Sequence, residues 1–241
     1  MSINTATTVR ELAIEVPGAT RLFEKLGIDY CCGGSSPLLA ACSSAGIAVE
    51  DVVRSLEQAS AAPIERDTTR DWRNEPLTAL VSYILETHHI FDREELDRIE
   101  PLMAKVASVY EKSHPELLEI QTVFIAMKAD LLTHMMKEER VLFPYIIELQ
   151  QAADVKGPKP VPFFGTVRNP VRMMSEEHDA VGDMLRSVRE LSSNFKVPAE
   201  GCFSYRTLYE ALEGIERDLH THIHLENNLL FPRAIEMEAA V

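Results

Sequence analysis

Two segments of this chain carry nearly the same fifteen-residue motif, at a constant offset of 88 residues. Residues 130–144 read DLLTHMMKEERVLFP and residues 218–232 read DLHTHIHLENNLLFP, with identical residues at eight of fifteen positions. Both follow the pattern D-L-x-T-H-x-x-x-E-x-x-x-L-F-P. Self-similarity at a fixed offset indicates an internal duplication. We therefore expect two related helical halves that form a pseudo-two-fold bundle.

Each copy of the motif places a histidine four residues before a glutamate, as His134 and Glu138 and as His222 and Glu226. On a helix this spacing brings both side chains to one face. That face also carries apolar residues such as Leu131, so it should point toward the core. Burying such groups is costly unless they are paired or bind a metal. The motif therefore predicts a metal site, with a buried ion pair as the alternative.

Histidines in the two partner helices complete the predicted set. His178 lies between Met174 and Val181 on an apolar stripe. His89 precedes His178 by 89 residues, close to the offset of the repeat, although helical phase alone barely separates it from His88. We expect four histidines and two glutamates to meet at mid-height of the bundle.

Apolar spacings of three and four, with few glycines, predict an almost entirely helical chain. Four long helices suggest a bundle, and the paired glycines after Cys32 predict a loop. A Ser113–Glu116 capping box should start the second long helix, and Pro101 is a candidate break in the first. The predicted parts are an N-terminal helical domain over 1–60, a linker over 61–74 and a bundle over 75–241, with helices near 9–15, 19–26, 49–59, 76–109, 116–151, 170–195 and 201–237.

Imidazole and carboxylate together suit iron or manganese better than a thiolate-rich site does. Two glutamates can bridge two ions, and four histidines then supply two nitrogens to each. Positions would remain for an oxo or hydroxo bridge and for O2 or NO. We expect Asp130 and Asp218 to orient the ligand histidines, with plain surface charge as the alternative. Aligned on Leu-Phe-Pro, the repeats leave His220 and His224 outside the set, so we expect these two at the periphery.

The doubled motif, joined to the N-terminal segment IDYCCGG, resembles the repair-of-iron-centres family, also called the ScdA or YtfE type. The resemblance covers nearly the whole chain. It implies an all-α fold, a hemerythrin-like four-helix bundle with a small N-terminal helical domain. It also implies a centre of two non-haem iron ions in which Glu138 and Glu226 are bridging, and it favours His89 over His88. Carried over by motif, the ligands are His89, His134, Glu138, His178, His222 and Glu226.

The same resemblance implies that the protein restores iron–sulfur clusters damaged by oxidative or nitrosative stress, by supplying iron. Its partners would be damaged iron–sulfur proteins and small ligands such as NO or O2. An NO-reducing enzyme and a module that binds or senses O2 or NO are alternatives. Cys31 and Cys32 would form a functional thiol pair that receives iron, reacts with NO or exchanges disulfides. The alternative for this pair is a tight turn of small residues, since adjacent cysteines rarely bridge each other without strain.

Composition and charge indicate the cellular compartment and the classes of partner. The formal net charge of -14 should repel nucleic acid and anionic membrane surfaces. The sequence has no apolar stretch of membrane-spanning length and no signal-peptide pattern at its start. We therefore expect a cytoplasmic protein with its four cysteines as free thiols. A homodimer is left open.

Overall fold

The computed structural model describes residues 3–61 and 71–241, and most of the predicted linker lies outside these ranges. The regular secondary structure of the described residues is helical, with an isolated antiparallel bridge between Thr8 and Pro37. This confirms the predicted all-α class. The chain forms two compact units, one of residues 1–75 with 220–232 and one of 76–219 with 233–241. No helix among the described residues is both long and apolar enough to cross a membrane.

The N-terminal helices begin and end where local signals predict. Thr8 and Glu11 form a capping box, in which the Thr8 hydroxyl accepts from the Glu11 amide at 3.2 Å and the Glu11 carboxylate accepts from the Thr8 amide at 2.9 Å. Gly27 ends the second helix with a left-handed φ of 66°. Buried apolar side chains, Phe23 and Leu56 among them, form the core of this unit. The helices are α1 (Val9–Glu15), α2 (Ala19–Leu26), α3 (Leu38–Ala45) and α4 (Val49–Ala61).

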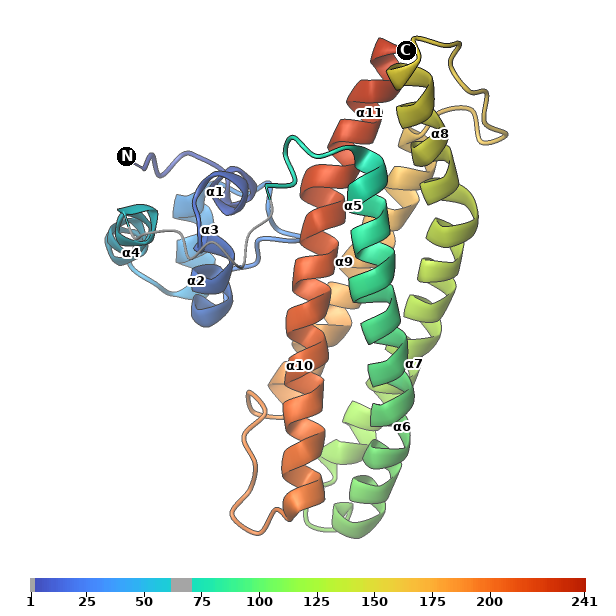
Figure 1. Cartoon of the computed structure of the whole chain (residues 1–241). Coiled ribbons are helices and arrows are strands. Elements are labelled where there is room, and N and C mark those ends of the chain that lie inside the picture. Colours follow the sequence, from blue (N-terminus) through green and yellow to red (C-terminus); the bar gives the residue numbers. More distant parts are fainter. Residues whose placement is uncertain (1–2, 62–70) are drawn as a thin grey trace. The chain divides into compact units, whose positions relative to one another are not determined.

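Among the described residues from 77 onward, four long helical rods run side by side in Figure 1. Three of them contain a short π-helical turn. The first rod is α5 (Leu77–Tyr83), η1 (Ile84–His89) and α6 (Ile90–Tyr110), and the second is α7 (Glu116–Lys137), η2 (Glu138–Leu142) and α8 (Phe143–Asp154). The third is α9 (Arg168–Leu191), and the fourth is α10 (Phe203–Leu225), η3 (Glu226–Leu230) and α11 (Phe231–Ala240).

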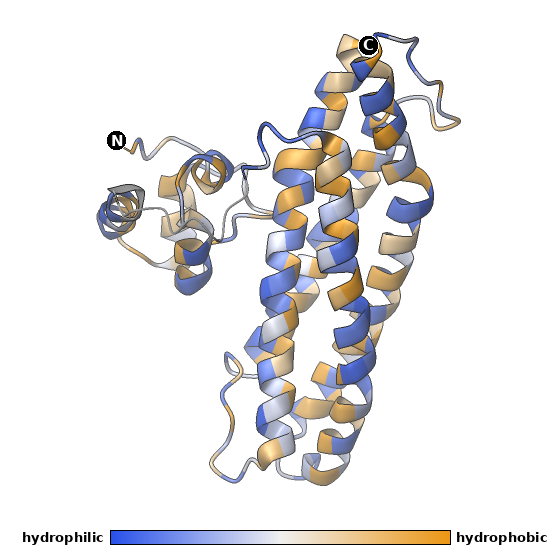
Figure 2. Cartoon of the chain, in the orientation of Figure 1, coloured by the Kyte–Doolittle hydropathy of each residue, from blue (hydrophilic) through white to orange (hydrophobic). Residues whose placement is uncertain are grey.

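Each rod is amphipathic, as the alternating orange and blue faces in Figure 2 show. Fully buried residues such as Leu80, Phe124 and Leu208 lie on the apolar faces, and their removal from water provides the main driving force for packing. The helix α6 continues through Pro101, so the predicted break is absent. The exposed ring of this proline costs the helix one backbone hydrogen bond and does not end it.

The predicted capping box at Ser113 is also absent, because the N-cap position of α7 lies two residues later. The helix has no side-chain cap, and its N-cap position is Pro115. The Ser113 hydroxyl donates instead to the Tyr110 carbonyl at 3.2 Å. Glu116 contacts His114 Nδ1 at 2.9 Å. The turn between α6 and α7 is therefore held by the side chains of Ser113 and His114.

A buried glutamate on α11 fastens the proline-rich connection between α8 and α9. Glu238 accepts hydrogen bonds from the Tyr145 hydroxyl at 2.7 Å, the Thr166 hydroxyl at 2.5 Å and the Val167 amide at 2.9 Å. Lys159 donates to the Glu238 backbone carbonyl at 2.9 Å. Burial raises the pKa of this carboxyl, but the three hydrogen bonds outweigh burial and hold the pKa below its usual value.

Replacing Glu238 should therefore loosen this end of the bundle. We expect Glu238→Ala to lower the free energy of unfolding by about 2–4 kcal/mol, because hydrogen bonds to a charged group contribute about 1.5–3 kcal/mol each and are not additive. Urea denaturation at pH 7 measures the loss. Glu236→Ala, an exposed glutamate on the same helix, is the control and should change stability little. Equal stability of the two variants would contradict this role.

The pH dependence follows from the lowered pKa of Glu238. A depressed folded-state pKa stabilises the protein above the unfolded-state pKa, and this stabilisation is lost as pH falls through the folded-state value. The difference in unfolding free energy between wild type and Glu238→Gln should therefore be largest near neutral pH and shrink in acid. Repeating the urea titration along a pH series tests this, and a difference that grows in acid would contradict it.

Candidate metal centre

Glu138 is fully buried, and each of its two carboxylate oxygens lies close to a different predicted ligand. Oε2 is 3.4 Å from His89 Nε2, and Oε1 is 3.3 Å from His134 Nε2. Both imidazoles are buried as well. A carboxylate that faces two imidazoles with separate oxygens would suit a bridge between two coordination sites, one beside His89 and one beside His134.

His178 faces the second of these sites. Its Nε2 is 3.0 Å from Nε2 of His134, and the two rings are tilted by 55°. Two imidazole nitrogens that lie about 2.1 Å from one ion and at right angles to each other are about 3.0 Å apart. The spacing therefore suits two neighbouring ligands of one metal ion.

The second copy of the motif repeats the arrangement of the first. His222 Nε2 lies 3.2 Å from Glu226 Oε1, and both side chains are buried. Donor atoms within 4.8 Å of one another form two groups of four, and both groups contain Glu138 and Glu226. The first group adds His89 and His222, and the second adds His134 and His178. All six residues predicted as ligands thus fall into these groups, and the donor set suits metal ions that prefer nitrogen and oxygen.

Three π-helical turns carry three of these donors. His89 ends η1, Glu138 begins η2 and Glu226 begins η3. The Phe143 amide donates to the Glu138 carbonyl, and the Phe231 amide to the Glu226 carbonyl, each five residues back. Such single π-turns are frequent at functional sites. In both copies of the motif a proline comes directly after this phenylalanine, and its missing N–H weakens the α-helical pattern there.

The π-turn η1 explains why sequence phase did not separate His88 from His89. Both side chains are buried. The wider π-turn changes their angular position on the helix relative to the α-helical residues before it, so a regular 3.6-residue period does not predict which of the two faces the core. His89 approaches Glu138, whereas His88 Nδ1 lies 2.8 Å from Asp218 Oδ2. His88 therefore lies outside both groups of donors.

Carboxylates hold the outer nitrogens of two candidate ligands. His89 Nδ1 is 2.8 Å from Glu139, and His134 Nδ1 is 2.8 Å from Glu177. This corrects the expected role of Asp130, which is exposed, because Glu177 occupies the position expected of Asp130. Asp218 does meet a histidine, but the contact is to His88. Neither glutamate was predicted, since each reaches its histidine from another helix.

Each of these outer carboxylates also meets a cation. Arg93 donates to Glu139 at 2.8 Å, and Lys137 pairs with Glu177. The hydrogen bond from His134 and the pairing with Lys137 outweigh burial and lower the pKa of Glu177 to about 2. Burial raises the pKa of Glu139, but Arg93 and His89 outweigh burial and lower it. Both carboxylates are therefore ionised at neutral pH, as acceptors for an imidazole N–H should be.

The loop that carries Cys31 and Cys32 contacts the second motif copy within its own unit. Asn228 donates to the Tyr30 carbonyl at 2.9 Å, and Asn227 makes a longer contact of 3.4 Å to the Cys31 carbonyl. The two asparagines stand where the first copy has Glu139 and Arg140. This difference between the two copies is the sequence signal that could have predicted a separate role for the second copy. The hydrogen bond with Cys32, together with burial, raises the pKa of the Cys31 thiol well above its usual value.

His224 also belongs to this region and corrects the expectation that it is peripheral. It is buried, its Nδ1 lies 2.8 Å from Asn228, and its ring meets Tyr30 edge-on with centroids 5.3 Å apart. Burial lowers the pKa of His224 to about 4. The imidazole is therefore neutral at physiological pH and acts in packing and hydrogen bonding.

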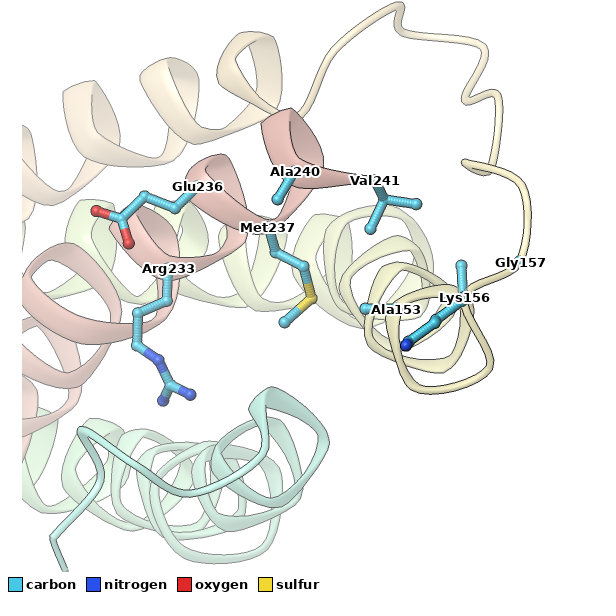
Figure 3. A pocket seen from close by; sticks show the side chains of 9 residues that line it. Ala153, Lys156, Gly157, Arg233, Glu236, Met237, Ala240 and Val241 are labelled. Atoms are coloured by element: carbon cyan, nitrogen blue, oxygen red, sulfur yellow. The ribbon is translucent and has the colours of Figure 1, made fainter.

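A separate cavity of about 630 Å³ lies where α8 and α11 end. Figure 3 shows Lys156, Arg233 and Glu236 beside small and apolar side chains. None of its lining residues is a candidate ligand. The predicted chemistry therefore belongs to the two donor groups and not to this cavity.

The outer carboxylates give a prediction about metal binding. We expect Glu139→Gln and Glu177→Gln each to weaken metal affinity by about 10–100-fold, the range found when such partners of ligand histidines are removed. Glutamine keeps an oxygen near Nδ1 but loses the charge that makes the imidazole more basic. Anaerobic competition between the protein and a chelator for Fe²⁺ measures the change. Glu176→Gln, an exposed neighbour on α9, is the control, and a similar affinity in all three variants would contradict the prediction.

Comparison with known proteins agrees with this geometry. Residues 80–234 match the hemerythrin HHE cation binding domain, and residues 5–60 match the ScdA N-terminal domain, described as a domain of unknown function (DUF542). The chain is 36% identical over 227 residues to the iron-sulfur cluster repair protein YtfE of Yersinia pseudotuberculosis serotype IB (strain PB1/+), covering 94% of this chain and 96% of that protein. It is 35% identical over 228 residues to the protein of the same name from Pectobacterium atrosepticum, covering 95% and 96%. The resemblance noted from the motifs is thereby confirmed, and the chain belongs to the hemerythrin HHE cation-binding family and, within it, to the iron-sulfur cluster repair proteins named YtfE.

Proposed function

We propose that this protein repairs iron–sulfur clusters damaged by oxidative or nitrosative stress, by supplying iron from a centre of two non-haem ions. One observation carries the proposal. Glu138 and Glu226 belong to both groups of buried donors, and each group adds two histidines of its own. We infer the substrate from the relatives, which are named iron-sulfur cluster repair proteins: it is a damaged cluster in another protein.

The donor set supports iron over softer metals. Each ion would be held by two imidazoles and share two carboxylates, His89 and His222 for one and His134 and His178 for the other. Nitrogen and carboxylate ligands without thiolate suit iron or manganese. When bound, iron would supply Lewis acidity and redox chemistry, and it would also be the material delivered to a cluster.

The chain's own residues would hold this iron and control its release. The buried carboxylates neutralise part of the charge of the ions, and Glu139 and Glu177 orient the imidazoles of His89 and His134. Two ligands per ion from imidazole leave coordination positions for small molecules such as NO or O2. We place the protein in the cytoplasm, with damaged iron–sulfur proteins as its partners.

Glu138→Ala tests the proposal. It removes a carboxylate shared by both donor groups, so the variant should hold fewer than two irons per chain and lose any absorption from an oxo bridge. It should also fail to restore an iron–sulfur enzyme inactivated by peroxide or NO, whereas iron-loaded wild type restores it. Metal analysis, an optical spectrum and an anaerobic reactivation assay measure these effects. Glu94→Ala, an exposed glutamate on α6, is the control.

Failure of fully iron-loaded wild type to restore the enzyme would overturn the repair function. Retention of two irons by Glu138→Ala would overturn the assignment of the site. Gas analysis during turnover with NO separates repair from the alternative of NO reduction, which would produce N2O at more than one equivalent per protein.

A further inference from the structure

A second cluster of metal-binding groups lies in the loop after α2, and it consists of Asp29, Cys31 and Cys32. The two sulfur atoms are 3.8 Å apart. Oδ1 of Asp29 lies 3.4 Å from Cys31 Sγ. One donor atom from each residue falls within 4.8 Å of the others, and all three residues belong to one short loop.

These distances match the edges of a tetrahedral coordination site. Two thiolates that each lie about 2.3 Å from one tetrahedral ion are about 3.8 Å apart. A carboxylate oxygen about 2.1 Å from the same ion would lie about 3.6 Å from each sulfur. The observed separations of 3.8 Å and 3.4 Å therefore need little change to close around one ion.

The loop is built so that the carboxylate lies under the two cysteines. Asp29 Oδ1 accepts the amides of Cys31 and Cys32 at 3.1 and 3.0 Å. A side chain on Gly33 would meet the Asp29 side chain at 3.2 Å, and one on Gly34 would meet the Tyr30 carbonyl at 2.8 Å. The paired glycines thus permit the close approach that brings the donors together, which accounts for the Cys-Cys-Gly-Gly sequence.

Exposure differs among the three donors in a way that suits an exchangeable ion. Cys31 is buried, Cys32 is half-buried and Asp29 is exposed. Three protein ligands leave the fourth tetrahedral position to water or to an incoming ligand, which is the pattern of sites that exchange ligands and not of closed structural sites. An ion held here would be reachable from solvent through its open position.

We propose that Asp29, Cys31 and Cys32 form a metal site distinct from the bundle centre, which binds one thiophilic divalent cation. Thiolate donors select such ions over hard ones. Binding converts both thiols to thiolates, so about two protons pass to the buffer for each ion taken up. The site adds to the proposed function a place where iron is passed on by ligand exchange. It rests on the proposed function only in the assignment of Fe²⁺ as the natural ion.

Cadmium provides a direct probe, because charge-transfer absorption in the ultraviolet arises from thiolate–Cd²⁺ bonds and not from imidazole or carboxylate ligands. Reduced, full-length protein whose bundle has been loaded with iron is titrated with Cd²⁺. We expect one equivalent to produce this band, with release of about two protons. Cys31→Ser and Cys32→Ser should abolish the band. Asp29→Asn, which keeps an oxygen for the two amides but loses the charge, should raise the Kd at least about tenfold.

Cys202→Ser is the matched control, because Cys202 is an exposed single thiol on the bundle, and it should leave the titration unchanged. Absence of the band in fully reduced wild type, or its persistence without Cys31 and Cys32, would overturn the site. Equal Kd values for wild type and Asp29→Asn would overturn the assignment of the carboxylate. A wild-type protein that binds Cd²⁺ in this way but fails to reactivate a damaged enzyme would contradict the proposed repair function and leave this site standing.

Discussion

The cost of burying charge in an apolar helical core is the constraint on which the bundle depends. Glu138 and Glu226 are both completely buried, and removing one ionised carboxylate from water costs several kcal/mol even after the protein relaxes. Apolar neighbours cannot repay this cost. Histidines lie within 3.4 Å of each carboxylate, and the two groups of donors that share Glu138 and Glu226 are placed so that bound cations would offset the rest of the cost.

The close approach of the histidines to the buried glutamates depends on departures from the regular α-helix. In a regular α-helix, residues four apart lie on one face. A π-turn changes the direction in which the following side chains point, so that a glutamate can also face a neighbouring rod. The π-turns η2 and η3 begin at Glu138 and Glu226, and η1 ends at His89. Local widening of three rods therefore occurs where the donors converge. The regular α-helix continues directly on either side of each π-turn.

Apolar spacing predicted the helical class and the long helices, and the duplicated motif predicted the grouping of His134 with Glu138 and of His222 with Glu226. It could not separate His88 from His89, because a π-turn changes the helical phase and leaves no periodic signal. The orienting carboxylates Glu139 and Glu177 were also beyond prediction. Their contacts cross between helices, and a pattern within one helix does not specify which neighbour a surface residue will meet.

Divergence between the two copies of the motif shows how one helical turn has been adapted to two tasks. After the shared glutamate the first copy continues with Glu139, which contacts the imidazole of the candidate ligand His89 and accepts a hydrogen bond from Arg93. In the second copy Asn227 and Asn228 stand where the first has Glu139 and Arg140, and they donate to backbone carbonyls of the loop that carries the cysteines. An amide suits this task because a carboxylate has no proton to donate to a carbonyl at neutral pH. The residues that the repeat shares gather the buried donors, whereas the residues in which the copies differ serve the surroundings of each half.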